Sequence, residues 1–325
     1  MISVVKPGLL TTIQDEGRPG WRAFGMPLAG AADADAYAAA NLLAGNEPGA
    51  AAIEMTLLGA TFRFGRSAWA AIAGADMQAR LDGDPVPPWS AFAVRAGGVL
   101  AFSGARAGAR CYLAVLGGVD VPVVLGSRST YTRAAVGGLD GRALAAGDDV
   151  PVGPPAPARG PRGRGARPVT LPADLVPPCD REVRLRVILG PQDDRFGADG
   201  LSTFLGAGFT VTNRNDRMGY QLEGPIIRHA AGADIVSDGI VPGSVQVPGS
   251  GAPIVMMADC ATVGGYTKIA TAIGADLPRI AQARVGDVVR FSACTQADAV
   301  RALRQREAWL AAVAGVADGA PGGER

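Results

Sequence analysis

The chain has 325 residues, of which 48% are apolar and 19% charged, and a formal net charge of +1. This composition excludes a disordered chain, and the near-neutral charge excludes a strongly basic surface for nucleic acid or anionic membranes. Four scattered cysteines and a single histidine, His229, argue against a metal centre and a Ser-His-Asp triad. Without an 18-residue apolar run or a signal peptide, we expect a cytoplasmic protein of two domains.

The N-terminal residues alternate short apolar runs with the polar turn QDEGRPGW. Gln14, Asp15 and Arg18 cluster there around glycine and proline, which predicts a loop at the rim of a pocket. The alternative is a turn closed by an exposed ion pair, which contributes under about 1 kcal/mol.

A helix is predicted over residues 33–45, because Asp33 is a good N-cap and Gly45 a good stop. Residues 51–64 and 69–75 then have the pattern of strands. Glu54 is the only acid in its apolar run, and a buried glutamate must be paired or protonated. We therefore take Glu54 as a candidate site residue.

Residues 76–125 contain several short strands with turn signals between them, including the hairpin dipeptide Asp82-Gly83. The polar segment LGSRSTYTRAAVGGLDGRALAAGDDV follows. Ser127, Arg128, Ser129 and Tyr131 stand together in it, and an arginine fork suits a carboxylate or phosphate. The alternative is a solvated loop at the rim of a barrel.

Residues 153–168 consist of Pro, Gly, Ala and Arg, which predicts a linker between a domain at 1–152 and another at 169–325. In the second domain, Asp216 and Arg217 form a candidate clamp within a tight turn. The last predicted element is a helix that begins after Thr295 as N-cap and packs on the second barrel through Val300, Leu303 and Leu310. Residues 315–325 are predicted to be disordered.

Residues 237–291 combine buried-strand patterns with polar side chains that have little freedom. Gly264-Gly265 permits positive φ or a close approach of another group. Beside it lie a carboxylate, an amide, hydroxyls and an ammonium, which could form a polar pocket: Gln246, Asp259, Thr262, Tyr266 and Lys268. The alternative is a glycine-rich turn whose polar groups bond its own backbone.

Three segments resemble the KipA family, also called the 5-oxoprolinase C-subunit (PxpC) family, allophanate hydrolase subunit 2 or biotin-dependent carboxyltransferase. They are QDEGRPGWRAFGMPLAGAADADAYAAANLLAGN, the segment at 125–150, and DGIVPGSVQVPGSGAPIVMMADCATVGGYTKIATAIGADLPRIAQARVGDVVRF. The resemblance covers nearly the whole chain apart from the linker and the tail. It implies a mostly β fold of two tandem cyclophilin-like β-barrel domains with a few short helices.

The same resemblance implies the C subunit of an ATP-dependent 5-oxoprolinase, a hydrolase that opens 5-oxoproline to glutamate. Its partners would be a KipI-like B subunit and a LamB/YcsF-like A subunit, and the chain alone would be inactive. We expect no metal and no covalent cofactor, with ATP used by the assembled complex. The expected catalytic residues are Arg128, Tyr131, Asp259 and Lys268. The expected substrate-binding residues are Gln14, Asp15, Arg18, Glu54, Ser127, Ser129, Gln246, Thr262, Gly264, Gly265 and Tyr266.

Two other functions remain open. One is a component of a biotin-dependent carboxyltransferase, as in urea carboxylase. This chain has no biotinyl-lysine motif, so another protein would supply the biotin. The other is a non-catalytic regulatory partner of a KipI-like protein. Allophanate hydrolysis is not expected, because the sequence has no amidase nucleophile motif.

Overall fold

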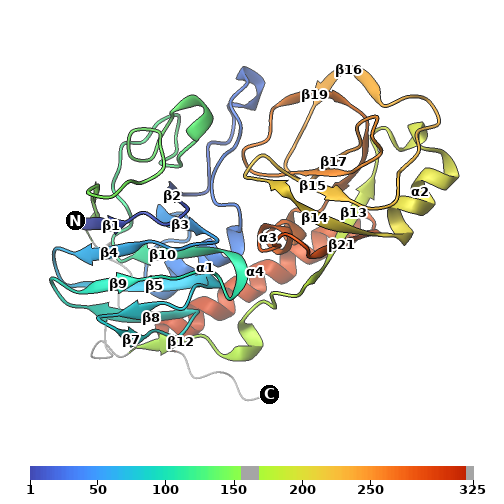
Figure 1. Ribbon diagram of the computed structural model, residues 1–325. Coiled ribbons are helices and arrows are strands. Elements are labelled where there is room, and N and C mark those ends of the chain that lie inside the picture. The colour runs from blue at the N-terminus through green and yellow to red at the C-terminus, as the bar shows by residue number, and fades with distance from the viewer. Residues whose placement is uncertain (155–167, 320–325) are drawn as a thin grey trace. The chain divides into compact units, whose positions relative to one another are not determined.

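The computed structural model describes residues 1–154 and 168–319, and the chain divides into two compact units (Figure 1). The first unit comprises Met1–Arg18, Ala29–Cys179 and Glu307–Arg325, and the second comprises Pro19–Leu28 and Asp180–Arg306. Most of the predicted linker, residues 155–167, lies outside the described residues. The mostly β fold predicted from the sequence is confirmed.

Two six-stranded sheets form the first unit, in the orders β11-β1-β4-β9-β6-β7 and β12-β8-β5-β10-β3-β2. Their strands are β1 (Ile2–Lys6), β2 (Leu10–Gln14), β3 (Ala52–Thr56), β4 (Thr61–Phe64), β5 (Ala68–Asp76), β6 (Arg80–Leu81), β7 (Asp84–Pro85), β8 (Ser90–Val94), β9 (Val99–Ala101), β10 (Ala107–Val115), β11 (Asp149–Val150) and β12 (Val169–Thr170). Apolar side chains from both sheets share one core, to which Phe62 and Leu100 contribute from one sheet and Ile53 and Leu113 from the other.

Helix α1 (Ala34–Ala44) covers the β5 and β10 side of this unit (Figure 1). It begins and ends as predicted. The Asp33 carboxylate accepts hydrogen bonds from the N–H groups of Asp35 and Ala36, and Gly45 closes the helix with φ of 81°. The Asp82-Gly83 hairpin is also confirmed, since both residues have positive φ between the paired strands β6 and β7.

The second unit is built on a closed barrel in the order β13-β20-β17-β18-β15-β14-β21. Its strands are β13 (Glu182–Leu189), β14 (Gly208–Asn215), β15 (Gly219–Glu223), β17 (Ser244–Gln246), β18 (Ile254–Met256), β20 (Lys268–Ala272) and β21 (Val288–Ala293). The shorter helices are α2 (Gly197–Gly206) and α3 (Leu277–Ala281). Phe204 of α2 is fully buried and stacks on Phe291 of β21, with ring centroids 4.4 Å apart.

A separate two-stranded ribbon stands beside the barrel strands in this unit. It pairs β16 (Asp234–Gly239) with β19 (Val263–Tyr266), and Val236 on β16 is 92% exposed. Five short 3₁₀ turns complete the described elements of the chain: η1 (Arg22–Phe24), η2 (Thr132–Ala134), η3 (Ala173–Leu175), η4 (Asp193–Arg195) and η5 (Gly274–Asp276).

The last helix, α4 (Gln296–Asp318), corrects part of the prediction. Thr295 and Asp298 cap its start reciprocally, as expected. However, Val300 and Leu303 stay more than 40% exposed, while Val313 is fully buried in the helix-side core of the first unit. The helix is also long, and it includes residues 315–318, which we predicted to be disordered. No helix in the described part of the chain is long and apolar enough to cross a membrane.

Candidate functional site

The predicted site residues divide between the two units, and the structure describes each group by itself. Those in the first unit are Gln14, Asp15, Arg18, Glu54, Ser127, Arg128, Ser129 and Tyr131. Those in the second unit are Gln246, Asp259, Thr262, Gly264, Gly265, Tyr266 and Lys268.

Asp15 is the centre of a dense hydrogen-bond network in the first unit, here called the Asp15 network. Its Oδ1 accepts from Ser127 Oγ and Ser129 Oγ, both at 2.5 Å, and from Gly17 N at 2.8 Å. Its Oδ2 accepts from Arg128 N at 2.5 Å. The sequence placed these residues in one site, and the structure does bring them together. Every one of these donors belongs to the protein itself.

Arg18 and Gln14 flank this network and are fully buried. Arg18 Nη2 donates to Ser129 O at 2.5 Å, and Gln14 Nε2 donates to Thr12 Oγ1 and Thr130 O. Gly137 must lack a side chain here, because it has φ of 70° and a Cβ would lie 2.1 Å from Ser129 O. The two N-terminal side chains therefore hold the 127–138 loop against β2.

The arginine fork proposed for anion binding is engaged by its own chain. Arg128 Nε donates to Val121 O at 2.8 Å, and Nη2 donates to Asp120 Oδ1 at 2.9 Å on the surface. Tyr131 pairs through its backbone with Val136 at the edge of the same loop. Ser127, Ser129 and Thr130 of this loop are buried, so the loop packs against its own unit rather than being solvated.

Glu54 lies in β3 and positions the start of helix α1. Its Oε2 accepts from Tyr112 Oη at 2.7 Å and from Ala32 N at 2.9 Å. The Tyr112 oxygen in turn accepts from Asp33 N, the residue that caps α1. Burial raises the pKa of Tyr112 well above its usual value, which keeps this phenol a donor to Glu54.

Lys268 begins strand β20 in the second unit and is only 2% exposed. Its Nζ donates to Asp238 Oδ2 at 2.7 Å and to Gly239 O at 3.0 Å. The hydrogen bond from Lys268 lowers the pKa of the Asp238 carboxyl. Gln192 supports both partners: its Oε1 accepts from Lys268 N at 3.0 Å, and its Nε2 contacts Asp238 Oδ2 at 3.4 Å. A buried ammonium is thus held by one carboxylate whose side chain is 54% exposed.

The choice of lysine at this position is unusual for this chain. Of its 31 basic residues only Lys6 and Lys268 are lysines, and the rest are arginines. A planar guanidinium fork needs more room than a compact ammonium. Of the two lysines, Lys268 is buried and Lys6 is exposed.

Asp259 is held in a buried ion pair with Arg217. Both carboxylate oxygens accept from this guanidinium at 2.9 Å, and the two side chains are 6% and 8% exposed. Asp216, the other residue of the predicted clamp, accepts from Met218 N at 2.7 Å. A buried, bidentate ion pair of this kind is typical of a structural contact.

Gln246 lies next to Lys268, since the two residues are opposite each other in the β17–β20 pairing. Gly264, Gly265 and Tyr266 lie in β19, and Gly264 packs against Ile240 and the Gln246 amide. Neither glycine has positive φ, so the absence of a side chain here serves close packing by neighbouring groups rather than an unusual backbone conformation. Thr262 contributes its carbonyl oxygen to Ile240 N. We call Lys268, Asp238, Gln192, Gln246 and Gly264 the Lys268 cluster.

Sequence reasoning missed three members of this neighbourhood: Asp238, Gln192 and Arg22. Asp238 stood within the quoted 237–291 stretch, and a lone Asp-Gly before a buried lysine was the available signal. Arg22 comes from the 19–28 segment, which belongs to the second unit, and its Nη2 donates to Ile240 O. Burial raises the pKa of the nearby Cys260 thiol, and Arg22 opposes that shift. Only the folded chain reveals these pairings.

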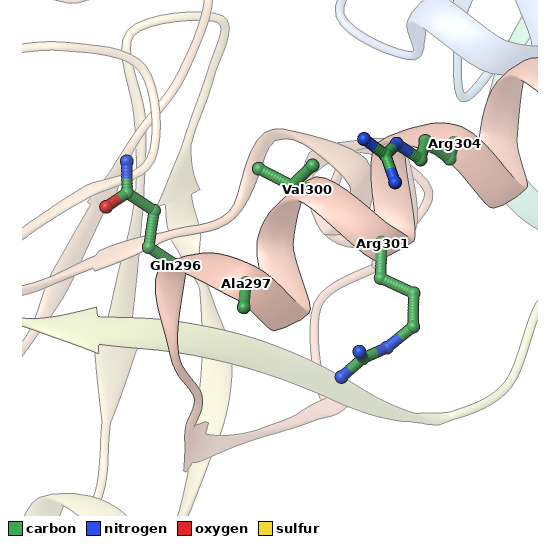
Figure 2. Close-up of a pocket in the computed structure, with 5 residues that line it drawn as sticks. All are labelled: Gln296, Ala297, Val300, Arg301 and Arg304. Carbon is green, nitrogen blue, oxygen red and sulfur yellow. The ribbon is translucent and has the colours of Figure 1, made fainter.

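A hollow of about 480 Å³ lies over the first turns of α4. Figure 2 shows its lining: Gln296, Ala297, Val300, Arg301 and Arg304. Arg301 points away from Val300 and bonds Asp298 at the start of the helix. None of the predicted site residues is among this lining. Within residues 1–154 and 168–319, no group of three His, Cys, Asp or Glu side chains could hold a metal ion.

Known proteins similar to this chain include 5-oxoprolinase C subunits and urea amidolyase. The C subunit of 5-oxoprolinase from Escherichia coli is 36% identical over 310 residues, which is 95% of this chain and 96% of that protein. The C subunit of 5-oxoprolinase from Haemophilus influenzae is 35% identical over 98% of this chain and 99% of that protein. Among solved structures, urea amidolyase of K. lactis superposes with a TM-score of 0.89 at 26% identity. That match covers 96% of this chain but only 20% of the urea amidolyase chain.

The family described as carboxyltransferase domain, subdomain A and B, matches residues 24–293. This span includes both the 125–150 segment and the Lys268 cluster. The chain therefore belongs to the carboxyltransferase-domain family and to the 5-oxoprolinase C-subunit family, as its motifs predicted.

Proposed function

We propose that this chain is the C subunit of an ATP-dependent 5-oxoprolinase that opens 5-oxoproline to glutamate. The observation that carries the proposal is the end-to-end match with the C subunit of E. coli 5-oxoprolinase, which covers 95% of one chain and 96% of the other. A relative that is named as one of several subunits implies an assembly. The partners proposed are a KipI-like B subunit and a LamB/YcsF-like A subunit, and ATP would be used by that assembly.

Opening a lactam places negative charge on the carbonyl oxygen and on any phosphoryl group that activates it, so a fixed positive charge nearby accelerates the step. Lys268 is suited to this role. An ammonium has three N–H donors, and the described part of the chain engages two of them, at Asp238 and Gly239. The third can meet an oxygen of the substrate, while Asp238 orients the ammonium.

The test is a reconstitution of the three subunits, followed by an assay of 5-oxoproline-dependent ATP hydrolysis and glutamate formation. Activity should require all three chains and should fall at least about 100-fold in Lys268→Met, the loss expected when a stabilising charge is removed from the transition state. Lys6→Met is the matched control, because Lys6 is an exposed lysine of the first unit. A stable complex without 5-oxoproline-dependent turnover would contradict the proposal.

Carboxyl transfer is the second candidate, favoured by the family match and by the similarity to urea amidolyase. The biotin would have to arrive on another protein. This chain's two lysines stand in Val5-Lys6-Pro7 and Thr267-Lys268-Ile269, neither of which resembles a biotinylation motif. Transfer of a carboxyl group from a carboxylated biotinyl domain to a small amide, with no 5-oxoproline turnover, would establish this candidate.

A further inference from the structure

The side-chain amide of Gln246 has an unmet hydrogen-bonding requirement. Gln246 is 5% exposed and lies in β17, between β18 and β20 of the barrel. In the part of the chain that the structure describes, its Nε2 is buried and has no hydrogen-bond partner. Leaving a buried donor unsatisfied costs about 1–3 kcal/mol, so such a group requires a physical explanation.

The surroundings of this amide indicate a ligand. A Cβ on Gly264 would lie 2.9 Å from Gln246 Nε2 and 2.4 Å from Ile240 Cδ1, so any side chain at 264 would collide with Ile240 and press on the amide. The strand that carries Gly264 reaches solvent, since its neighbours Val263 and Tyr266 are 59% and 43% exposed. The buried donor therefore lies behind a residue without a side chain, in an otherwise exposed ribbon.

A second donor stands beside the first. Gln246 and Lys268 are opposite each other on adjacent antiparallel strands, which places their side chains on the same face of the barrel wall. One is a neutral N–H donor and the other an ammonium, and both are more than nine-tenths buried. Two donors on the same face match a group that offers acceptors only, such as a carboxylate or an amide carbonyl.

Gln14 in the first unit shows what a structural amide looks like by comparison. Its Oε1 also has no partner among the described residues, but its Nε2 is anchored twice, to Thr12 and Thr130. Gln14 is fully buried, and both of its sequence neighbours, Ile13 and Asp15, are buried as well. No such anchor holds the Nε2 of Gln246 among the described residues, and packing positions this amide instead.

We infer that Gln246 Nε2 and Lys268 Nζ together bind an oxygen-bearing group, a carboxylate or an amide carbonyl, of a small ligand. Gly264 is a positioning residue, because any side chain there would displace Ile240 or the Gln246 amide from its present place. The inference deepens the proposed function, on which its choice of 5-oxoproline as probe rests. That molecule carries both a lactam carbonyl and a carboxylate.

The first test replaces the amide in the reconstituted complex. Gln246→Met keeps the approximate length of the side chain and removes the donor. The KM for 5-oxoproline should rise about tenfold or more, since one hydrogen bond to a ligand contributes about 1.4 kcal/mol. Thermal unfolding of the full chain should be unchanged or shifted upward, because an unsatisfied buried amide has been removed. A lower melting temperature with an unchanged KM would overturn the inference in favour of a structural role.

Two glycines of the second unit supply a matched pair of variants. Gly264→Ala places a methyl group 2.9 Å from Gln246 Nε2, whereas a Cβ on Gly206, at the end of α2, meets no other element of the described chain within 4 Å. We expect Gly264→Ala to raise the KM as Gln246→Met does, and Gly206→Ala to leave it unchanged. Equal effects from the two substitutions would overturn the role given to Gly264.

Failure of the proposed function can be told apart from failure of this inference. If the wild-type complex shows no 5-oxoproline-dependent turnover, the proposed function falls, and NMR of the full chain decides the second question. The side-chain NH₂ resonances of Gln246, identified by their loss in Gln246→Met, should then shift on addition of 5-oxoproline, pyrrolidin-2-one or proline. A shift with pyrrolidin-2-one alone identifies a carbonyl site, and one with proline alone a carboxylate site. No shift with any of the three overturns the inference.

Discussion

The Asp15 network and the Lys268 cluster have similar residue types, but they differ in how completely their polar groups are hydrogen-bonded. Asp15 receives four hydrogen bonds from its own loops, from Ser127, Ser129, Gly17 and Arg128. Lys268 is buried against a half-exposed carboxylate, beside an amide whose nitrogen has no partner among the described residues. All four of these contacts of Asp15 are made by its own chain, whereas the Lys268 cluster holds a buried N–H donor without a partner among the described residues.

In sequence the two regions are nearly indistinguishable. Each has carboxylates, hydroxyls and a basic residue around paired glycines, Gly137-Gly138 in one and Gly264-Gly265 in the other. The glycines have different roles. Gly137 has φ of 70° and allows its loop to close on Ser129 O, while Gly264 lies in a strand without positive φ and lets Ile240 and the Gln246 amide pack closely against it. The conformation of each pair therefore separates a loop closure from a close packing contact.

The largest effect that would test this contrast is on the stability of the first unit. Asp15→Asn turns an acceptor towards Arg128 N into a donor and removes the charge that three further donors share. We expect it to lower the free energy of unfolding by about 2–3 kcal/mol, measured by urea denaturation. Asp120→Asn is the control, because Asp120 pairs with Arg128 on the surface and should change stability by under about 1 kcal/mol. Equal, small changes would show that the Asp15 network is not structural.

A smaller effect is expected at Lys268, and it depends on the shape of the substituent. Lys268→Arg must fit a planar fork into a site that is 2% exposed, and overpacking of this kind costs about 1–3 kcal/mol. Lys268→Met should stay within about 1 kcal/mol of wild type, because an apolar isostere replaces a buried charge and Asp238 remains hydrated. Urea denaturation of the two variants compares them directly. A loss in Lys268→Met as large as that in Asp15→Asn would place both regions in the same structural class.

Local rules were sufficient for much of the fold. The Asp33 cap, the Gly45 stop, the Asp82-Gly83 hairpin and the Thr295 start of α4 each depend on a few adjacent residues, and the structure confirms each of them. Packing partners depend on the whole chain instead. Val313 lies in the core of the first unit although its helix begins in the second, and nothing in the helix pattern indicates which core it joins.

The same limit applies to the candidate site. Lys268, Gln246 and Gly264 could be named from their motif, but Asp238 could not be chosen over Asp259 as the partner of the lysine. Arg217, 42 residues before Asp259 in the chain, occupies both oxygens of that carboxylate. Whether a polar group finds a hydrogen-bond partner depends on contacts between residues far apart in the chain. The distinction between the two polar regions could therefore not be predicted from the sequence.

The smallest expected effect is a pH dependence that reports on the Lys268–Asp238 pair. Lys268 lowers the pKa of Asp238 below its ordinary value of 3.8. A lowered pKa in the folded state contributes stability above the unfolded value, and this contribution is lost as pH falls through the folded value. Wild type should therefore lose stability relative to Lys268→Met below about pH 4, where the variant has no pair to lose.

Melting temperatures of both proteins between pH 7 and pH 3 would measure this difference. Arg142→Met provides a reference in the first unit, because Arg142 lowers the pKa of Asp148 in the same way. A difference between wild type and Lys268→Met that stays constant down to pH 3 would mean that Asp238 does not hold the ammonium in solution. Another group would then have to pair with the Lys268 ammonium, and Asp238 would no longer belong to the Lys268 cluster. A difference that changes below pH 4 in both variants would show that the buried and the surface pair titrate alike, and the Gln246 amide would then be the feature that distinguishes the Lys268 cluster from the Asp15 network.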